Sequence, residues 1–213
     1  NSIIFYLCAG MCSSALIDNA FSMNDAWKQP DCNGCVIVPA NVRRINDYSF
    51  KGRTDIKSVH LKNVQSIGQH AFNGCSGLTS IAIPDGVTSI DTGTFSGCSK
   101  LSSIAIPTSV KSIGSNAFEE CTWLMSITIP TSVKSIGDRT FHACSGLISI
   151  TIPTSVTEIC AWAFYGCSGL TSITLPNSVI SIGFRAFEGC TGLTEITIPN
   201  SVASIDYWAF NGC

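Results

Sequence analysis

The feature that most restricts the fold of this chain is a cysteine that returns every 23 residues. A phenylalanine three residues earlier keeps the same spacing from Phe72 to Phe210. A fixed period of about 20 to 50 residues is the signature of a solenoid, in which each repeat buries its apolar side only by stacking on its neighbours. We therefore expect functional residues on the surfaces of a rod rather than in one cleft. The cysteines of this row are Cys75, Cys98, Cys121, Cys144, Cys167, Cys190 and Cys213.

Eight repeats fit between Val36 and Cys213, and the clearest of them covers residues 127–149. The first repeat has Arg53 where cysteine belongs, and the second is one residue short because Lys62-Asn63 replaces a Pro-x-Ser segment. No linker or low-complexity segment interrupts the series. We predict one elongated solenoid domain over residues 36–213, preceded by an N-terminal cap over residues 1–35.

Each repeat divides into a strand and a return path. In Leu-x-x-Ile-x-Ile-Pro, as at residues 147–153, apolar and polar residues alternate, which predicts a short parallel strand with its isoleucines inward. Proline lacks an amide donor and should end the strand. In the return path, Val-x-x-Ile-Gly-x-x-Ala-Phe-x-x-Cys, apolar residues lie three, four and five apart, which predicts turns followed by a short helical or 3₁₀ piece. The phenylalanine row should fill the core opposite the strands.

The full pattern, Leu-x-x-Ile-x-Ile-Pro-x-Ser-Val-x-x-Ile-Gly-x-x-Ala-Phe-x-x-Cys, resembles the BspA-type leucine-rich repeat over about residues 36–213. The resemblance implies an α/β leucine-rich repeat solenoid, with a curved parallel β-sheet on its concave side and short helical or 3₁₀ return segments. It also implies a secreted or cell-surface protein that adheres to host or matrix proteins. The family has no common ligand, and a fold by itself does not fix function.

Composition and motif content argue against two classes of function. With 12% charged residues and a net charge of −2, the chain has no basic stripe for phosphates, so nucleic acid is not the expected partner. The three histidines, His60, His70 and His142, fall at three different positions of the repeat and suggest no nucleophile–base pair. No glycine-rich phosphate loop is present either. We predict a non-catalytic protein without a cofactor.

The cysteine row suggests metal binding or disulfides, and both interpretations meet difficulties. Metal ligands must converge on one point, whereas these sulfurs are spread along the rod with no histidine in the row. Stacked strands lie about 4.8 Å apart, which is within the range that a disulfide bridges. Side chains stacked in the same orientation, however, point parallel rather than at each other. We interpret the row as small buried thiols, weakly hydrogen-bonded to turn carbonyls and packed like apolar residues.

The N-terminal region has a separate cluster of cysteines at Cys8, Cys12, Cys32 and Cys35. Residues 14–28 place apolar side chains on one helical face, which predicts a helix that caps the open end of the solenoid. If the protein is extracellular, the cluster gives two cap disulfides in one of three connectivities. A four-thiolate zinc site is the alternative. The apolar stretch at the start resembles part of a secretory signal but is too short to span a bilayer, so we expect no membrane insertion.

Two residues between Ile-Gly and Ala-Phe vary freely, and toward the C-terminal end they become aromatic and basic. One such residue per repeat would stack, so that each guanidinium lies on an indole face. Large aromatics and arginine dominate binding hot spots, which suggests contact with a partner; the alternative is stacking that only covers the rod. The candidate partner-binding residues are Arg139, Trp162, Tyr165, Phe184, Arg185, Tyr207 and Trp208.

Two further surfaces give alternative functions. The outward strand positions form a neutral array of serine and threonine, which would order water as ice-binding solenoids do or bind glycans, unless these are simply small residues that favour strands. Beyond Cys213 no capping sequence follows, so either the native chain continues or the open end docks on another subunit, giving a head-to-tail filament. We expect an extracellular protein-binding or adhesion module, with a structural protomer of a surface filament as the alternative.

Overall fold

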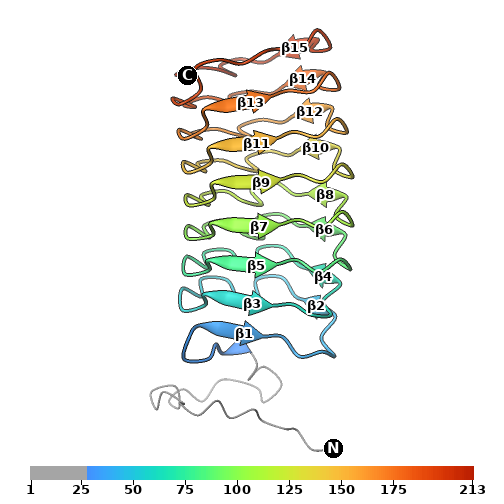
Figure 1. Cartoon of the computed structure of the whole chain (residues 1–213), viewed down its shortest axis with the longest axis vertical. Helices are drawn as coiled ribbons and strands as arrows, with labels where there is room; N and C mark the ends of the chain where they lie inside the picture. Colours follow the sequence, from blue (N-terminus) through green and yellow to red (C-terminus); the bar gives the residue numbers. More distant parts are fainter. Residues whose placement is uncertain (1–27) are drawn as a thin grey trace, which may run out of the picture.

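The computed structural model describes residues 28–213, in which the chain winds into coils stacked along one axis (Figure 1). The parallel-strand solenoid expected from the repeat is confirmed. Cys8, Cys12 and the predicted cap helix up to residue 27 lie outside the described residues, so the boundary between cap and solenoid stays a prediction.

One side of the stack consists of three-residue strands, which form two hydrogen-bonded ladders of four and three strands and are together called the first sheet. The central residue of each strand is buried and the residue after it is exposed, as the alternating pattern requires. Each strand pairs in parallel with the same residues of a neighbouring coil, for example Ile150 with Ile127 and with Ile173. The strands are β1 (Cys35–Ile37), β3 (Ser58–His60), β5 (Ser80–Ala82), β7 (Ser103–Ala105), β9 (Ser126–Thr128), β11 (Ser149–Thr151) and β13 (Ser172–Thr174).

A second set of parallel strands, only two residues long, forms where the chain has turned after the proline. These strands form ladders of two, two and four strands and are together called the second sheet. Seven coils carry a strand in both sheets, while the last coil has β15 alone (Figure 1). The strands are β2 (Arg44–Ile45), β4 (Ser66–Ile67), β6 (Ser89–Ile90), β8 (Ser112–Ile113), β10 (Ser135–Ile136), β12 (Glu158–Ile159), β14 (Ser181–Ile182) and β15 (Ser204–Ile205).

The core is a set of columns, one for each apolar position of the repeat. The phenylalanines stack face to face from Phe50 to Phe210, with neighbouring ring centroids 5.1–5.6 Å apart and ring planes within 12° of parallel. The rings from Phe50 to Phe187 are completely buried. Such columns extend across every coil boundary, so each coil is stabilised by burial against its neighbours.

The return segments of residues 28–213 contain turns in place of the short helical pieces that we predicted. In the sixth coil, the amides of Trp162, Phe164 and Gly166 donate to carbonyl oxygens of the next coil over 2.7–2.9 Å. The alternate amides, those of Tyr165 and Cys167, donate three residues back. Trp162 and Gly166 have φ of 53° and 69°, in the left-handed region. A helix would need every amide for its own ladder, and two left-handed residues in five interrupt it.

In the first coil, at the N-terminal end of the stack, an arginine occupies the position of the cysteine. Arg53 forms two hydrogen bonds to the Asp55 carboxylate, of 2.8 and 2.7 Å, and reaches the carbonyl of Lys28 at 3.4 Å. Its guanidinium donates the hydrogen bonds that hold the pKa of Asp55 below the ordinary value. This departure from the repeat therefore ties the first coil to the chain that precedes it.

The second left-handed position predicts a matched pair of stability effects. It is glycine in most coils but Ala143 in the fifth, with φ of 57°. Because a Cβ in this conformation costs about 1–2 kcal/mol, part of which is offset by glycine's greater freedom in the unfolded chain, Ala143→Gly should stabilise the protein by about 0.5–1 kcal/mol in urea unfolding.

The reverse change in the next coil is the control. A Cβ on Gly166 would meet no atom closer than Ala143 Cα at 3.7 Å, so Gly166→Ala introduces backbone strain without a clash. It should destabilise the protein by a similar amount. Equal stability of both variants and the parent would show that the left-handed conformation is not maintained in solution.

Candidate partner-binding site

Four of the candidate residues occupy the same turn position in four successive coils. Arg139, Trp162, Arg185 and Trp208 have φ of 53°, 53°, 55° and 59°, all in the left-handed region. The coil-to-coil hydrogen bonds fix their register, since the amide of Trp162 donates to the coil above at 2.9 Å and that of Arg185 at 3.1 Å. We call these four residues together with Phe184 the Arg–Trp ridge.

The ridge alternates cations and aromatic rings. The guanidinium carbon of Arg139 lies 4.5 Å from the ring centroid of Trp162, and that of Arg185 lies 4.5 Å from Trp208. The Phe184 ring lies 5.1 Å from the Arg185 guanidinium carbon, and its centroid lies 5.0 Å from that of Trp162 in an edge-on contact. The structure thus has the expected stacking, which holds the long side chains in fixed positions while leaving ring faces and edges at the surface.

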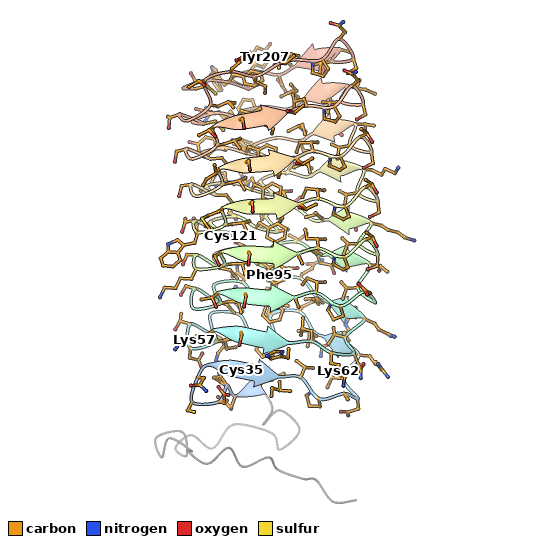
Figure 2. All side chains as sticks on the ribbon, viewed as in Figure 1. Cys35, Lys57, Lys62, Phe95, Cys121 and Tyr207 are labelled. Carbon is orange, nitrogen blue, oxygen red and sulfur yellow. The ribbon has the colours of Figure 1, made fainter. Side chains whose placement is uncertain are left out.

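The C-terminal end of the ridge is exposed, and so is the tyrosine beside it. Trp208 is 56% exposed and its neighbour Tyr207 is 79% exposed, whereas Trp162 and Arg185 are partly buried within the stack. Tyr207 lies in the last coil, at the far end of the rod from Cys35 (Figure 2). The Nε of Arg185 lies 3.1 Å from a carboxylate oxygen of Glu188, which partly neutralises that guanidinium. Arg139 has no ion pair in the described structure and is exposed.

Tyr165 belongs to a different column from the Arg–Trp ridge. Its ring stacks on His142 of the preceding coil, with centroids 4.9 Å apart. His142 Nδ1 in turn lies 3.5 Å from Oε1 of Glu119, and the other carboxylate oxygen, Oε2, accepts a hydrogen bond of 2.9 Å from the Asn116 side chain. The sequence placed Tyr165 beside the ridge because of its spacing, but the side-chain contacts assign it to this polar column.

The row of cysteines forms a column that is buried from Cys75 to Cys190 and exposed at Cys213, and each thiol has one acceptor. Cys144 Sγ donates to the carbonyl of Phe118 in the preceding coil at 3.0 Å, and that carbonyl also accepts the amide of Cys121 at 3.2 Å. The same contact recurs from Cys75 to Cys213 over 3.0–3.2 Å. Burial raises the pKa of the Cys144 thiol to about 12, so the column is protonated and unreactive at neutral pH.

The other cysteines and the histidines do not form a site in the described part of the chain. Cys32 and Cys35 are free thiols there, while Cys8 and Cys12 lie outside the described residues, so the predicted cap disulfides stay a prediction. Residues 28–213 contain no cluster of three or more side chains suited to hold a metal ion. Among the same residues, no helix is long and apolar enough to cross a membrane.

The hydroxyl array of the first sheet is present as a geometric feature. Ser126 and Thr128, Ser149 and Thr151, and Ser172 and Thr174 are exposed in three adjacent strands. The array is not continuous, because Ala82 and Ala105 take the threonine position in earlier coils. Water ordering or glycan binding by this face stays a prediction, as does end-to-end association.

Sequence reasoning missed an exposed apolar cluster at the corner that leads into the first sheet. Trp123, Met125 and Ile148 are each about half exposed, and the amide of Ile148 donates to the carbonyl of Met125 at 3.0 Å. The signal was available in the repeat, since other coils have glycine, lysine or aspartate at the tryptophan position and mostly serine or threonine at the position of Met125 and Ile148.

Comparisons with known proteins agree with this architecture. The sequence model described as BspA type Leucine rich repeat region, in six copies, matches residues 24–147 and 93–213. A solved leucine-rich repeat protein of T. pallidum is similar at 32% identity with a TM-score of 0.70, over 76% of this chain and 79% of that chain. A second, from Eubacterium ventriosum, is similar at 27% identity with a TM-score of 0.67, over 86% of this chain and 47% of that chain.

A more distant solved structure shows the fold alone. The pneumococcal vaccine antigen PcpA is 19% identical with a TM-score of 0.52, over 86% of this chain and 57% of that chain. No curated protein sequence matches the chain.

The thiol column predicts a loss of stability in alkali. The pKa of Cys144 is about 12 when folded against an ordinary value of 9.0, so the unfolded chain releases the proton first. The stabilisation held by the protonated thiol is therefore complete below about pH 9 and is lost as pH rises toward 12. Urea unfolding between pH 8.5 and 10.5 should show a slope up to about 1.4 kcal/mol per pH unit steeper than in Cys144→Ala. Equal slopes would contradict burial of this thiol.

Proposed function

Because the chain belongs to the BspA-type leucine-rich repeat family, we propose that it is a non-catalytic binding module that acts at the cell surface or outside the cell. The expected partner is a protein or a matrix component. The family resemblance supports the location and the general role, since such repeats typically belong to surface proteins. The observation that carries binding by this chain is the Arg–Trp ridge.

The ridge suits protein recognition for three reasons. Its tryptophans and arginines are the residue types that contribute most at protein interfaces. Contacts between neighbouring rings and guanidinium groups hold these side chains in place before a partner arrives, which reduces the entropy lost on binding. Arg139 and Trp208 are exposed at the two ends of the stack, so a partner can approach both without disrupting it.

The test replaces the ridge tryptophans by serine. Each of Trp162→Ser and Trp208→Ser should weaken binding to immobilised extracellular-matrix extract by about tenfold or more, because an interface tryptophan typically contributes at least 2 kcal/mol. Surface plasmon resonance measures the binding, and the thermal midpoint should stay nearly unchanged.

Trp123→Ser is the matched control, because Trp123 is 58% exposed against 56% for Trp208 but lies outside the ridge. It should leave binding unchanged. If all three variants lose binding equally, the ridge is not the contact surface. A large fall in the thermal midpoint of the ridge variants would show instead that their stacking serves stability.

A further inference from the structure

The one irregular spacing in the repeat removes a specific residue from the corner of the second coil. The strand register is kept, since His60 pairs with Ala82. In the third coil the amide of Val87 then donates to the carbonyl of Pro84 at 3.0 Å, whereas in the second coil the amide of Val64 donates to that of Leu61 at 3.2 Å. The turn of the second coil therefore begins one repeat position earlier than the turn of the third coil. The position that the second coil lacks is the one that proline occupies in the other coils.

A groove of about 650 Å³ lies where this proline is missing. Pro39 of the first coil and Pro84 of the third form two of its walls, and Leu61 and Lys62 line it between them. The short turn is tied to the first coil, because the Asn63 side chain donates to the carbonyl of Ala40 at 2.9 Å. The volume is typical of sites that hold a small ligand or a short segment of chain.

The groove continues onto the face of the first sheet. A second hollow of about 300 Å³ shares His60 and Ala82 with the first and extends to Ala105 in the fourth coil. It exists because alanine occupies the outward position in these two coils, where Thr128 and the following coils have threonine. The two hollows share lining residues, and together they form a channel across the first four coils. Lys62, which lines it, lies toward the Cys35 end of the rod (Figure 2).

The lining is apolar except for two groups that carry or can acquire positive charge. Ile37 is 69% exposed in the groove, and His60 and Lys62 are the titratable side chains of its lining. No carboxylate lines either hollow. Residues 28–62 contain seven lysines and arginines against three acidic residues, so this end of the rod is positive although the whole chain has a net charge of −2. An apolar channel with this charge is complementary to an anion flanked by apolar groups.

We propose that the channel binds an extended segment of a protein partner in which one carboxylate lies between apolar side chains. The Lys62 ammonium holds the carboxylate, and the apolar side chains lie against Ile37 and the hollow over Ala82. The proposal rests on the proposed binding function in requiring a protein partner. It uses the opposite end of the rod from the Arg–Trp ridge, so each site is tested by its own variants.

The experiment uses the full chain and an array of acetylated pentapeptide amides with a central glutamate flanked by leucine, valine or phenylalanine. The same array with a central glutamine is the matched probe. Titrations followed by the methyl resonances of Ile37 and Ala82 should show glutamate peptides binding about tenfold more tightly than their glutamine partners. Lys62→Gln should abolish this difference, while Lys134→Gln, which removes an exposed lysine three coils away, should preserve it.

Insertion of a proline between Leu61 and Lys62 restores the regular repeat and should fill the groove, abolishing binding of both arrays at an unchanged thermal midpoint. The Trp162→Ser variant should bind the peptides normally, so failure of the ridge and failure of the channel are distinguishable. The proposal is overturned if no glutamate peptide shifts the two methyl groups, or if both lysine variants bind alike. Nuclear Overhauser contacts from these methyls to residues 1–27 or to a second copy would assign the channel to another occupant and also overturn it.

Discussion

The structure depends on the hydrogen bonds that join the turn of one coil to the turn of the next. In the turns that carry the phenylalanines, successive backbone amides donate alternately to a carbonyl three residues back and to a carbonyl of the adjacent coil. This pattern requires left-handed residues at fixed positions. Once that alternation is set, the buried phenylalanines lie directly over one another, and the phenylalanine carbonyls from Phe50 to Phe187 each receive a second donor from a thiol. The strands of the first and second sheets keep the same register, because the turn and both strands of a coil belong to one short run of chain.

Much of this could be predicted from the sequence because repetition converts spacing into position. The 23-residue period gave the number of coils, the inward isoleucines and the phenylalanine column without any structural information. The stacking of Arg139 on Trp162 also follows from spacing, since residues one period apart must be neighbours. Partner binding by these side chains does not follow in the same way, because exposure and stacking are compatible with either role.

The turn conformation could not be predicted in the same manner. Apolar residues three to five apart fit a helix, and most of the residues at the first left-handed position, such as Arg139 and Trp162, are not glycine. Only the hydrogen bonds to the adjacent coil overcome their preference, and those bonds are not local in sequence. Tyr165 shows a related limit, since its contact with His142 depends on which of two adjacent columns its side chain joins.

The shortened corner of the second coil shows how such a rod tolerates a change in length. Loss of a residue there is absorbed within one turn, because the amide of Val64 finds a carbonyl one position earlier and the strands on either side keep their partners. In a globular domain, deletion of one residue from a buried segment would displace the side chains packed against that segment. Here the neighbouring coils keep their conformation although the second coil is one residue shorter. Single-residue deletions are thus a route by which a uniform repeat array acquires recesses of its own, one layer at a time, without redesign of its interior.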